Sequence, residues 1–373
     1  MSFDIQEVKS NSDRELFVNF QFKIYKENSY WVPPIKNDEL KSLMSDKNPA
    51  FDFCDAKFWI LKKDGELVGR IGAIVNKLYN EKVNEQFGRI TKVEFIDDND
   101  TVDLLFKTAT DWLKSKGMKK VHGPLGFTNL DTQGLLIEGF DFLPSIASVY
   151  HLSYYQNQFD RLGFKKENDW LEFRLTLTDK PVNKASRGAA LIKRRFGYDV
   201  IQFTKKSEMQ AYSKEIFQIL NEAFQNLPYV NKFNDKMIDL YSKKYFQVLD
   251  PRFVRVVKKD DDIVGFVVGL PSMSRAMQKT KGKLFPFGIL HLLKALKQPK
   301  EIDLLLTGVL EDHQNNGVAV ILFAELQTEM LKSNIKIMET TGIFESNQNV
   351  IANWKNYENI QHKRRRCYIK DIL

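Results

Sequence analysis

The two halves of this 373-residue chain repeat one order of secondary-structure signals. In each half, hydrophobic periodicity and turn residues predict helices, a β-hairpin, a strand, a helix, a strand, a helix and a final strand. The first hairpin is predicted at 58–75, where Asp64-Gly65 supplies the turn, and the second at 253–271. A repeat of this kind predicts two tandem copies of one α/β fold of the α+β type, each built on a mixed sheet of parallel and antiparallel strands.

The length agrees with two domains, because one hydrophobic core rarely serves more than about 250–300 residues. We expect a first domain at 1–178 and a second at 191–373, joined by the polar segment between them. The chain is 43% hydrophobic and 28% charged, which is typical of a globular protein.

The cysteines and the apolar runs of the sequence indicate the cellular compartment and whether the protein spans a membrane. Cys54 and Cys367 are the only two cysteines and lie too far apart to indicate a zinc knuckle or a disulfide framework. The beginning of the chain lacks the apolar core of a signal peptide, and the run 285–296 is about half as long as a membrane span. These features predict a cytoplasmic protein without a membrane partner.

The net charge of +8 favours an acidic partner, which could be nucleic acid, an anionic cofactor or a membrane surface. Six lysines and no acidic residue lie between Lys279 and Lys300, and a second basic run occupies 363–366. Such runs most often form a solvated face of the protein, and this is the expectation for both.

The segment 311–331 places a polar run directly before a strongly apolar helix. Its central residues are Gln314, Asn315, Asn316, Gly317, Val318 and Ala319. A helix N-terminus presents unpaired N–H groups and a partial positive charge, so it can hold a pyrophosphate, and Gly317 allows the close approach. The alternative is an ordinary helix capped by Asn315 or Asn316.

The order of elements and this segment resemble the GNAT superfamily of N-acetyltransferases. In that family the fourth strand leads into Gln/Arg-x-x-Gly-x-Gly/Ala, which Gln314, Gly317 and Ala319 match after the predicted strand 302–310. The stretches 122–144 and 281–288 also resemble uncharacterised bacterial two-domain GNAT-like proteins. The resemblance implies acetyl-CoA or another acyl-CoA as co-substrate, bound by residues 314–319, and no metal.

The corresponding helix start in the first half lacks these features. It reads Asp97, Asp98 and Asp100 and has no glycine. Carboxylates at this position would repel a pyrophosphate, so we expect the first copy to be degenerate and its acids to cap the helix.

Acyl transfer to an amine requires a bound thioester, a donor for the oxyanion, a base and an acid. The strand end at Val309 and Leu310 is expected to supply backbone donors to the thioester. Glu311 and Glu339 are the candidate bases, although Glu311 could be simply solvated and Glu339 could pair with a basic residue of the last strand.

The family resemblance implies two further residues. Asn347 and Val350 have the spacing of the family's Asn-x-x-Ala pattern, and Asn347 would contact the cofactor. The family's tyrosine acid is replaced by Trp354, so Tyr357, one turn later, is the candidate acid.

Two classes of function follow. The first is an acyl-CoA-dependent N-acyltransferase that transfers an acetyl group to a small-molecule or peptide amine. The second is a GNAT-like binding module without chemistry, or an aminoacyl-tRNA-dependent transferase, with a basic face for nucleic acid. Lysines around 279–288 could serve the CoA 3′-phosphate or keep an aromatic loop in solution. P-loop, HExxH and GxSxG motifs are absent, so nucleoside triphosphatases and metal or serine hydrolases have little support from the sequence.

Overall fold

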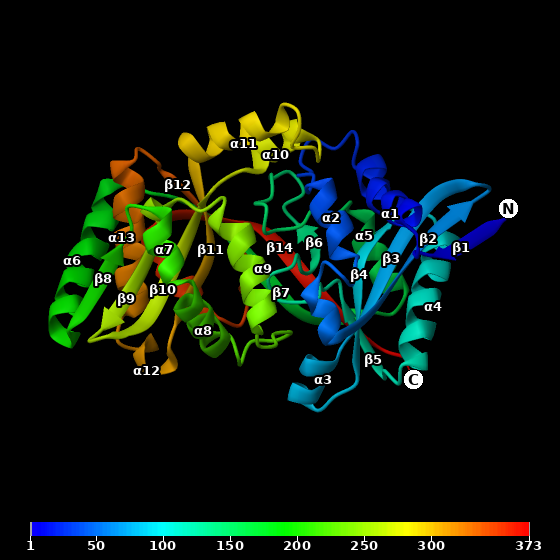
Figure 1. Cartoon of the computed structure of the whole chain (residues 1–373), viewed down its shortest axis with the longest axis horizontal. Helices are drawn as coiled ribbons and strands as arrows, with labels where there is room; N and C mark the ends of the chain where they lie inside the picture. The colour runs from blue at the N-terminus through cyan, green and yellow to red at the C-terminus, as the bar shows by residue number, and fades with distance from the viewer. Residues whose placement is uncertain (1, 373) are drawn as a thin grey trace. The chain divides into compact units, whose positions relative to one another are not determined.

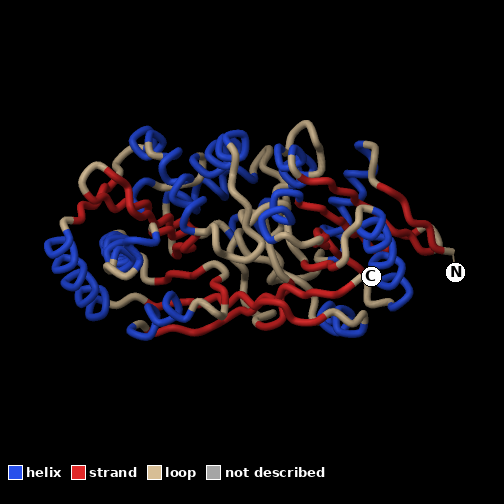
Figure 2. The backbone as a smooth tube through the Cα atoms, turned by 90° about the horizontal axis from the view of Figure 1, so that it is seen from below, coloured by secondary structure: helices blue, strands red, loops and turns tan. Residues whose placement is uncertain are grey.

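The computed structural model describes residues 2–372, and the chain divides into two units that are each built around paired strands (Figure 1). Unit 1 comprises residues 2–171, 274–291 and 363–372, and unit 2 comprises 172–273 and 292–362. Three elements contribute residues to both units: β7 (Lys165–Thr176), α11 (Gly288–Lys297) and β14 (Glu358–Asp371). Figure 2 distinguishes the helices from the strands and the loops that join them.

The strands of unit 1 pair in the order β1-β2-β3-β4-β5-β14, and β6 also pairs with β14. Their bounds are β1 Phe3–Glu7, β2 Cys54–Lys63, β3 Glu66–Asn76, β4 Phe87–Phe95, β5 Lys120–Gly123 and β6 Leu135–Glu138. Neighbours run antiparallel except β4 and β5, which are parallel. The turn predicted at Asp64-Gly65 is confirmed, because both residues have positive φ, 50° and 86°.

The helices of unit 1 cover these strands. Their bounds are α1 Asn11–Ile24, α2 Lys36–Ser42, α3 Lys77–Val83, α4 Asn99–Ser115, α5 Tyr154–Arg161 and α10 Ser274–Thr280, with a 3-10 turn at Pro49–Asp52. The helix α4 buries one apolar stripe against the sheet, as its 3.6-residue periodicity predicts. That stripe is Val102, Leu105, Phe106, Ala109 and Leu113.

The strands of unit 2 pair in the order β7-β12-β11-β10-β9-β8. Their bounds, apart from β7, are β8 Tyr198–Gln202, β9 Val254–Lys259, β10 Asp262–Pro271, β11 Glu301–Val309 and β12 Ile337–Thr340, and the short β13 is Ile343–Phe344. Only β11 and β12 are parallel, and the other neighbouring pairs are antiparallel. Strands β8 to β12 therefore repeat β1 to β5, and the predicted tandem α/β fold is confirmed.

The final strand of each half is exchanged between the units. The C-terminal part of β7 completes the sheet of unit 2, and the C-terminal part of β14 completes that of unit 1. The two units consequently do not correspond to one cut of the chain between 178 and 191.

The helices of unit 2 lie on both faces of its sheet. Their bounds are α6 Asp179–Phe196, α7 Lys206–Ala211, α8 Ser213–Ala223, α9 Asp235–Phe246, α12 Glu311–Gln314, α13 Val318–Lys332 and α14 Gln348–Ala352, with 3-10 turns at Pro251–Phe253 and Asn353–Asn356. Gly265 of β10 faces α13, because an added Cβ would lie 2.9 Å from Val318. Val268, of opposite parity, lines a pocket with Phe217 of α8, so α8 and α13 cover opposite faces.

The polar join predicted at 178–191 is a helix rather than a loop. Helix α6 lies alongside α13, with Ser186 Oγ 3.0 Å from Thr328 Oγ1 and Lys193 Nζ donating to Glu325 at 2.7 Å (Figure 1). The buried apolar residues of α6, Val182 and Ala189, form a narrow stripe. Because most residues of the segment are polar, its sequence gave no clear helical periodicity.

The basic run 363–366 is not the solvated face that its sequence predicts. Lys363 is fully buried and donates to backbone carbonyls of residues 139 and 142, while Arg365 donates to the Gln133 carbonyl. Arg364 and Arg366 hold the buried carboxylate of Asp169. All four cationic side chains therefore have partners inside unit 1.

None of the helices in the described part of the chain combines the length and the apolar composition that crossing a lipid bilayer requires.

Candidate functional site

The parallel strands β11 and β12 of unit 2 separate partway along their length. They pair from Glu301 to Leu304 of β11, where the side chain of Thr341 also donates to the Leu304 carbonyl. The register of β11 with β10 skips one residue at Leu305, which is a β-bulge that bends the strand. Within residues 2–372, β12 thus leaves the second half of β11, 305–309, as an open sheet edge.

The open edge presents backbone N–H groups. The N–H of Leu310 donates to the Val264 carbonyl at 3.0 Å, so Leu310 faces β10. Successive residues of a strand point to opposite edges, and the N–H groups of Val309 and Thr307 therefore face the open side. Of the two donors predicted from sequence, Val309 is available to a ligand and Leu310 is used by the sheet.

Unit 1 contains the same strand end in a closed form. Ile96 N–H donates to the Val68 carbonyl at 3.0 Å, so Phe95 is the counterpart of the open residue of β11. The Phe95 N–H donates to the hydroxyl of Tyr155 at 3.1 Å, and the Phe95 carbonyl accepts from Tyr154 at 2.6 Å. Two tyrosines of α5 thus occupy the edge that is open in unit 2.

A buried carboxylate anchors this tyrosine plug. Glu94 accepts hydrogen bonds from Tyr25 at 2.6 Å and Tyr155 at 2.7 Å, and Arg70 lies 3.6 Å away. Burial raises the pKa of the Glu94 carboxyl, although Arg70 and the hydroxyl donors act in the opposite direction. The plug is therefore a fixed part of the unit 1 core.

The two equivalent helices differ in the same way. Helix α4 is capped by Asp98, whose carboxylate accepts from the Thr101 N–H at 3.0 Å, as predicted. Helix α13 begins at Gly317 with φ 79°, and no side chain caps it. Asn315 lies at the end of α12 and the Asn316 amide donates to the Asp312 carbonyl, so neither is the alternative cap.

The partial positive charge at the N-terminus of α13 is therefore not compensated by a capping side chain. Val318, Ala319 and Val320 follow Gly317, and the first N–H groups of a helix lack intrahelical acceptors. Val318 is buried, and Gly317, Ala319 and Val320 are half-buried. The arrangement fits an anionic group such as a pyrophosphate.

Gln314 connects this helix start to the open strand edge. Its side-chain amide donates to the Val309 carbonyl at 3.1 Å. The Gln314 side chain thus orders the turn between β11 and α13, and its contact with a ligand stays a prediction.

Glu339, a candidate base, lies in a buried ion-pair network of unit 2. Arg174 donates to one of its oxygens at 3.0 Å, and His362 Nε2 lies 3.1 Å from the other. Arg174 also pairs with Glu301 at 2.6 Å. A carboxylate held in this way is a structural partner and a restricted base. Its hydrogen-bonded cation is Arg174 of β7, whereas the alternative interpretation named a basic residue of the last strand, which contributes His362.

Asp303 lies directly opposite Glu339 in the β11–β12 register and was not singled out from the sequence. It is 1% exposed. Burial, and then the negative charge of Glu339, raises the pKa of the Asp303 carboxyl well above its ordinary value. An acid within an otherwise apolar strand was the available sequence signal.

Replacing Asp303 with asparagine is expected to make the protein more stable at about pH 8 than the wild type. The folded pKa of Asp303 is raised above its unfolded value, so the native state binds more protons and its free energy of unfolding falls as pH rises through that window. Urea unfolding at about pH 8 and about pH 4 checks this, because the advantage of the variant shrinks toward the acid end. An equal difference at both pH values contradicts the assignment.

Three further residues that the sequence analysis named are Glu311, Asn347 and Trp354. Glu311 is exposed at the start of α12, and Asn347 caps α14 by accepting from the Val350 N–H at 3.3 Å. Trp354 is buried against Phe323 of α13.

Tyr357, the candidate acid, donates its hydroxyl to Gln327 at 2.7 Å. Burial raises the pKa of the Tyr357 hydroxyl, which makes it a weaker acid. Its catalytic role stays a prediction.

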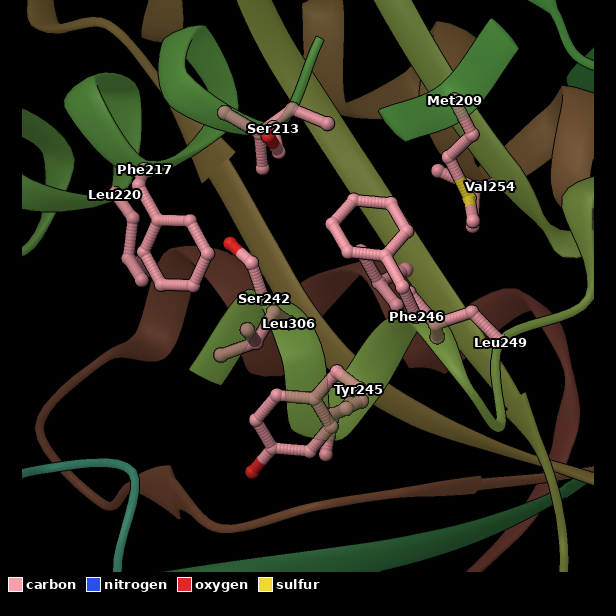
Figure 3. Close-up of a pocket in the computed structure, with 13 residues that line it drawn as sticks. Met209, Ser213, Phe217, Leu220, Ser242, Tyr245, Phe246, Leu249, Val254 and Leu306 are labelled. Carbon is pink, nitrogen blue, oxygen red and sulfur yellow. The ribbon is translucent and has the colours of Figure 1, made fainter. Parts of the chain in front are cut away.

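An apolar pocket opens beside the bulged strand and was missed from the sequence (Figure 3). It lies between α8, α9 and the sheet of unit 2, and Figure 3 shows the side chains that line it. Residues that line it include Phe217, Leu220, Phe246, Leu249, Val268 and Leu306. Ser242 also lines it, and no residue among 2–372 hydrogen-bonds its buried hydroxyl oxygen.

This pocket touches the strand that carries the open edge. Leu305, the bulged residue, and Leu306 both line it. A group held at the edge of β11 thus lies beside a small apolar space.

Comparisons with known proteins agree with this geometry. The model of the acetyltransferase (GNAT) family matches residues 213–357. The chain is 27% identical to the protein YghO of Escherichia coli strain K12 over 373 aligned residues, which cover 97% of this chain and 94% of that protein. It is 26% identical to the bacterial ceramide synthase of Caulobacter vibrioides over 294 residues, which cover 78% of this chain and 75% of that protein.

Solved structures repeat the whole tandem arrangement. A tandem GNAT protein from the clavulanic acid biosynthesis pathway superposes with a TM-score of 0.57 at 11% identity, covering 100% of this chain and 99% of that chain. A GCN5-related N-acetyltransferase from Sphaerobacter thermophilus superposes with a TM-score of 0.54 at 11% identity, covering 99% and 96%. Residues 213–357 therefore match the acetyltransferase (GNAT) family, and the chain as a whole has a tandem GNAT-like fold.

Proposed function

We propose that the protein is an acyl-CoA-dependent N-acyltransferase that binds its acyl donor in unit 2 only. One observation carries the proposal: the strand edge and the helix start that are open at Val309 and Gly317 are closed in unit 1 by Tyr155 and Asp98. Two copies of one fold thus differ at the two places where a thioester and a phosphate would bind.

The residues of unit 2 have separate tasks in this reaction. The amides after Gly317 hold the pyrophosphate, and the Val309 N–H donates to the thioester oxygen as it becomes an oxyanion. When bound, acyl-CoA supplies an activated carbonyl carbon, which the amine nitrogen attacks while the carbon–sulfur bond breaks. The amine loses one proton to a base, for which exposed Glu311 is the less restricted candidate, and the thiolate gains one.

The substrate class follows from the apolar pocket. We propose that it accepts part of a long aliphatic chain, carried by the acyl donor or by the amine, because the pocket is lined mainly by Leu, Val and Phe side chains. The similarity to a ceramide synthase supports this choice, since a ceramide is an amide that carries long chains. The product expected here is a long-chain amide.

The direct test is thiol release by the purified protein. Palmitoyl-CoA or acetyl-CoA is mixed with a long-chain primary amine, free thiol is followed spectrophotometrically, and the amide is identified by mass spectrometry. We expect amine-dependent thiol release with palmitoyl-CoA exceeding that with acetyl-CoA. Absence of amide with every pairing of long and short donors and amines contradicts the proposed function.

Filling the pocket is expected to shift the substrate preference toward shorter aliphatic chains. In Ser242→Leu, the added carbon atoms occupy pocket space, so kcat/KM for the long-chain substrate falls at least about tenfold, and that for a short-chain substrate changes little. Ser213→Ala, which removes one oxygen at the same pocket, is the matched control. Equal losses for long and short chains in Ser242→Leu would show that the pocket does not hold the chain.

A further inference from the structure

Four large apolar side chains are concentrated on one exposed stretch of nine residues before and within α11. Phe285 is 77% exposed, Phe287 71%, Leu290 58% and Leu293 47%. Water-exposed apolar side chains are usually scattered singly, whereas a contiguous group marks a surface that another molecule covers.

The local backbone holds this stretch in place. The Ile289 N–H donates to the Leu284 carbonyl at 2.7 Å, and the Lys283 N–H donates to the Thr280 carbonyl at 3.0 Å. The two phenylalanines therefore project from an ordered turn rather than from a loose end.

Helix α11 continues the same surface. Its positions Leu290, Leu293, Lys294 and Lys297 follow the 3.6-residue period and are all exposed. The other apolar residues, Ile289, Leu292 and Leu296, are half-buried. The helix thus has an apolar face beyond the one that packs inward.

The charge around these side chains has one sign. All six charged residues from Lys279 to Lys300 are lysines, and the segment contains no acid. Lys281, Lys283, Lys294 and Lys297 are exposed on both sides of the apolar group. Exposed apolar residues flanked by lysines match a bilayer surface, where acyl chains meet anionic headgroups.

We propose that the segment 281–297 docks the protein on the surface of an anionic lipid bilayer. Phe285, Phe287, Leu290 and Leu293 insert at the boundary between headgroups and acyl chains, and the lysines contact lipid phosphates. Docking of this kind is interfacial and requires no membrane-spanning helix. This replaces the expectation from sequence that the protein has no membrane partner, and it is independent of the proposed transfer reaction.

The test is co-sedimentation of the full chain with vesicles, without CoA or amine. Vesicles of phosphatidylglycerol mixed with phosphatidylcholine are compared with phosphatidylcholine alone. We expect binding to the anionic vesicles that Phe285→Ser/Phe287→Ser weakens at least about tenfold and that Lys281→Gln/Lys283→Gln also weakens. Leu191→Ser, at a position 60% exposed on α6, is the control and should bind as the wild type.

Two results of this experiment would overturn the proposal of bilayer docking. Lack of binding to anionic vesicles overturns the proposal, as does equal binding by the double phenylalanine variant and the wild type. If vesicles do not bind and light scattering shows that the double variant loses a dimer, the surface joins two copies of the chain instead. Because no substrate is present, failure here leaves the thiol-release assay as a separate test of the transfer reaction.

Discussion

Replacing Ala319 with aspartate is expected to weaken CoA binding at least about 100-fold without unfolding the protein. Ala319 is the second residue of α13, where the free N–H groups of the helix point outward. A carboxylate there meets the pyrophosphate at short range, and two like charges about 4 Å apart cost roughly 4 kcal/mol at surface-like effective dielectric. The same carboxylate favours the helix itself, because it lies at the positive end of the dipole.

Ala319 is a sharper choice than the motif glycine. Gly317 has φ 79°, and a Cβ at this position would lie 2.7 Å from Ile192 of α6, so any substitution there strains the fold as well as the site. Ala319→Asn adds nearly the same volume without charge and is the matched control. Asp98→Asn alters the equivalent helix of unit 1 and should leave CoA affinity unchanged. Isothermal titration that finds wild-type affinity in Ala319→Asp contradicts the position of the phosphate site.

Replacing Asp169 with asparagine is expected to cost about 3–5 kcal/mol of unfolding free energy. The Asp169 side chain is fully buried and accepts from Arg366 at 2.8 and 3.0 Å and from Arg364 at 3.0 Å. Removing its charge takes the Asp169 counter-charge away from both guanidinium groups inside unit 1, although Arg364 keeps its ion pair with Glu138 at 3.0 Å. Urea unfolding measures the loss, and Asp111→Asn, which breaks an exposed pair with Lys107, should change stability by less than about 0.5 kcal/mol.

The same carboxylate predicts acid sensitivity. Burial alone raises the pKa of Asp169, but the hydrogen bonds from Arg366 and Arg364 outweigh it and hold the pKa below its usual value. A folded pKa below the unfolded one stabilises the protein above the unfolded pKa, and this contribution is lost as pH falls through the folded pKa. We expect the difference between wild type and Asp169→Asn to shrink in that acid range. A difference that is independent of pH would contradict the ion-pair explanation.

Local signals predicted much of the fold because they act over a few residues. The turn at Asp64-Gly65, the stripe of α4 and its acidic cap all depend on neighbours within one turn or one hairpin. The repeated order of elements then predicted the tandem fold. Helix α6 was missed because it packs against α13, which lies far away in the sequence.

Other features depend on partners distant in sequence and gave no local signal. The exchange of β7 and β14 is decided by pairing between strands from different halves. The basic run 363–366 is polar by composition, yet its partner Asp169 lies almost 200 residues earlier. The tyrosine plug of unit 1 likewise requires Tyr155 to meet Phe95 across 60 residues.

The candidate site was predicted in part for the same reason. Gly317 and its neighbours form one continuous segment, so the motif could be read directly from the chain. The pocket beside Leu305 is assembled from six separate elements, and Asp303 acquires its raised pKa mainly through burial and the charge of Glu339. Catalytic assignments to Glu311, Glu339 and Tyr357 stay predictions that kinetic variants must test.

The central claim is that one unit of this tandem fold binds acyl-CoA and the other has lost the site. Calorimetric titration of the wild-type chain with CoA tests it most directly, because the stoichiometry counts the sites. We predict one CoA per chain. Two CoA molecules per chain would show that the closed edge and the acidic cap of unit 1 do not exclude the ligand, and absence of binding would contradict the role given to unit 2.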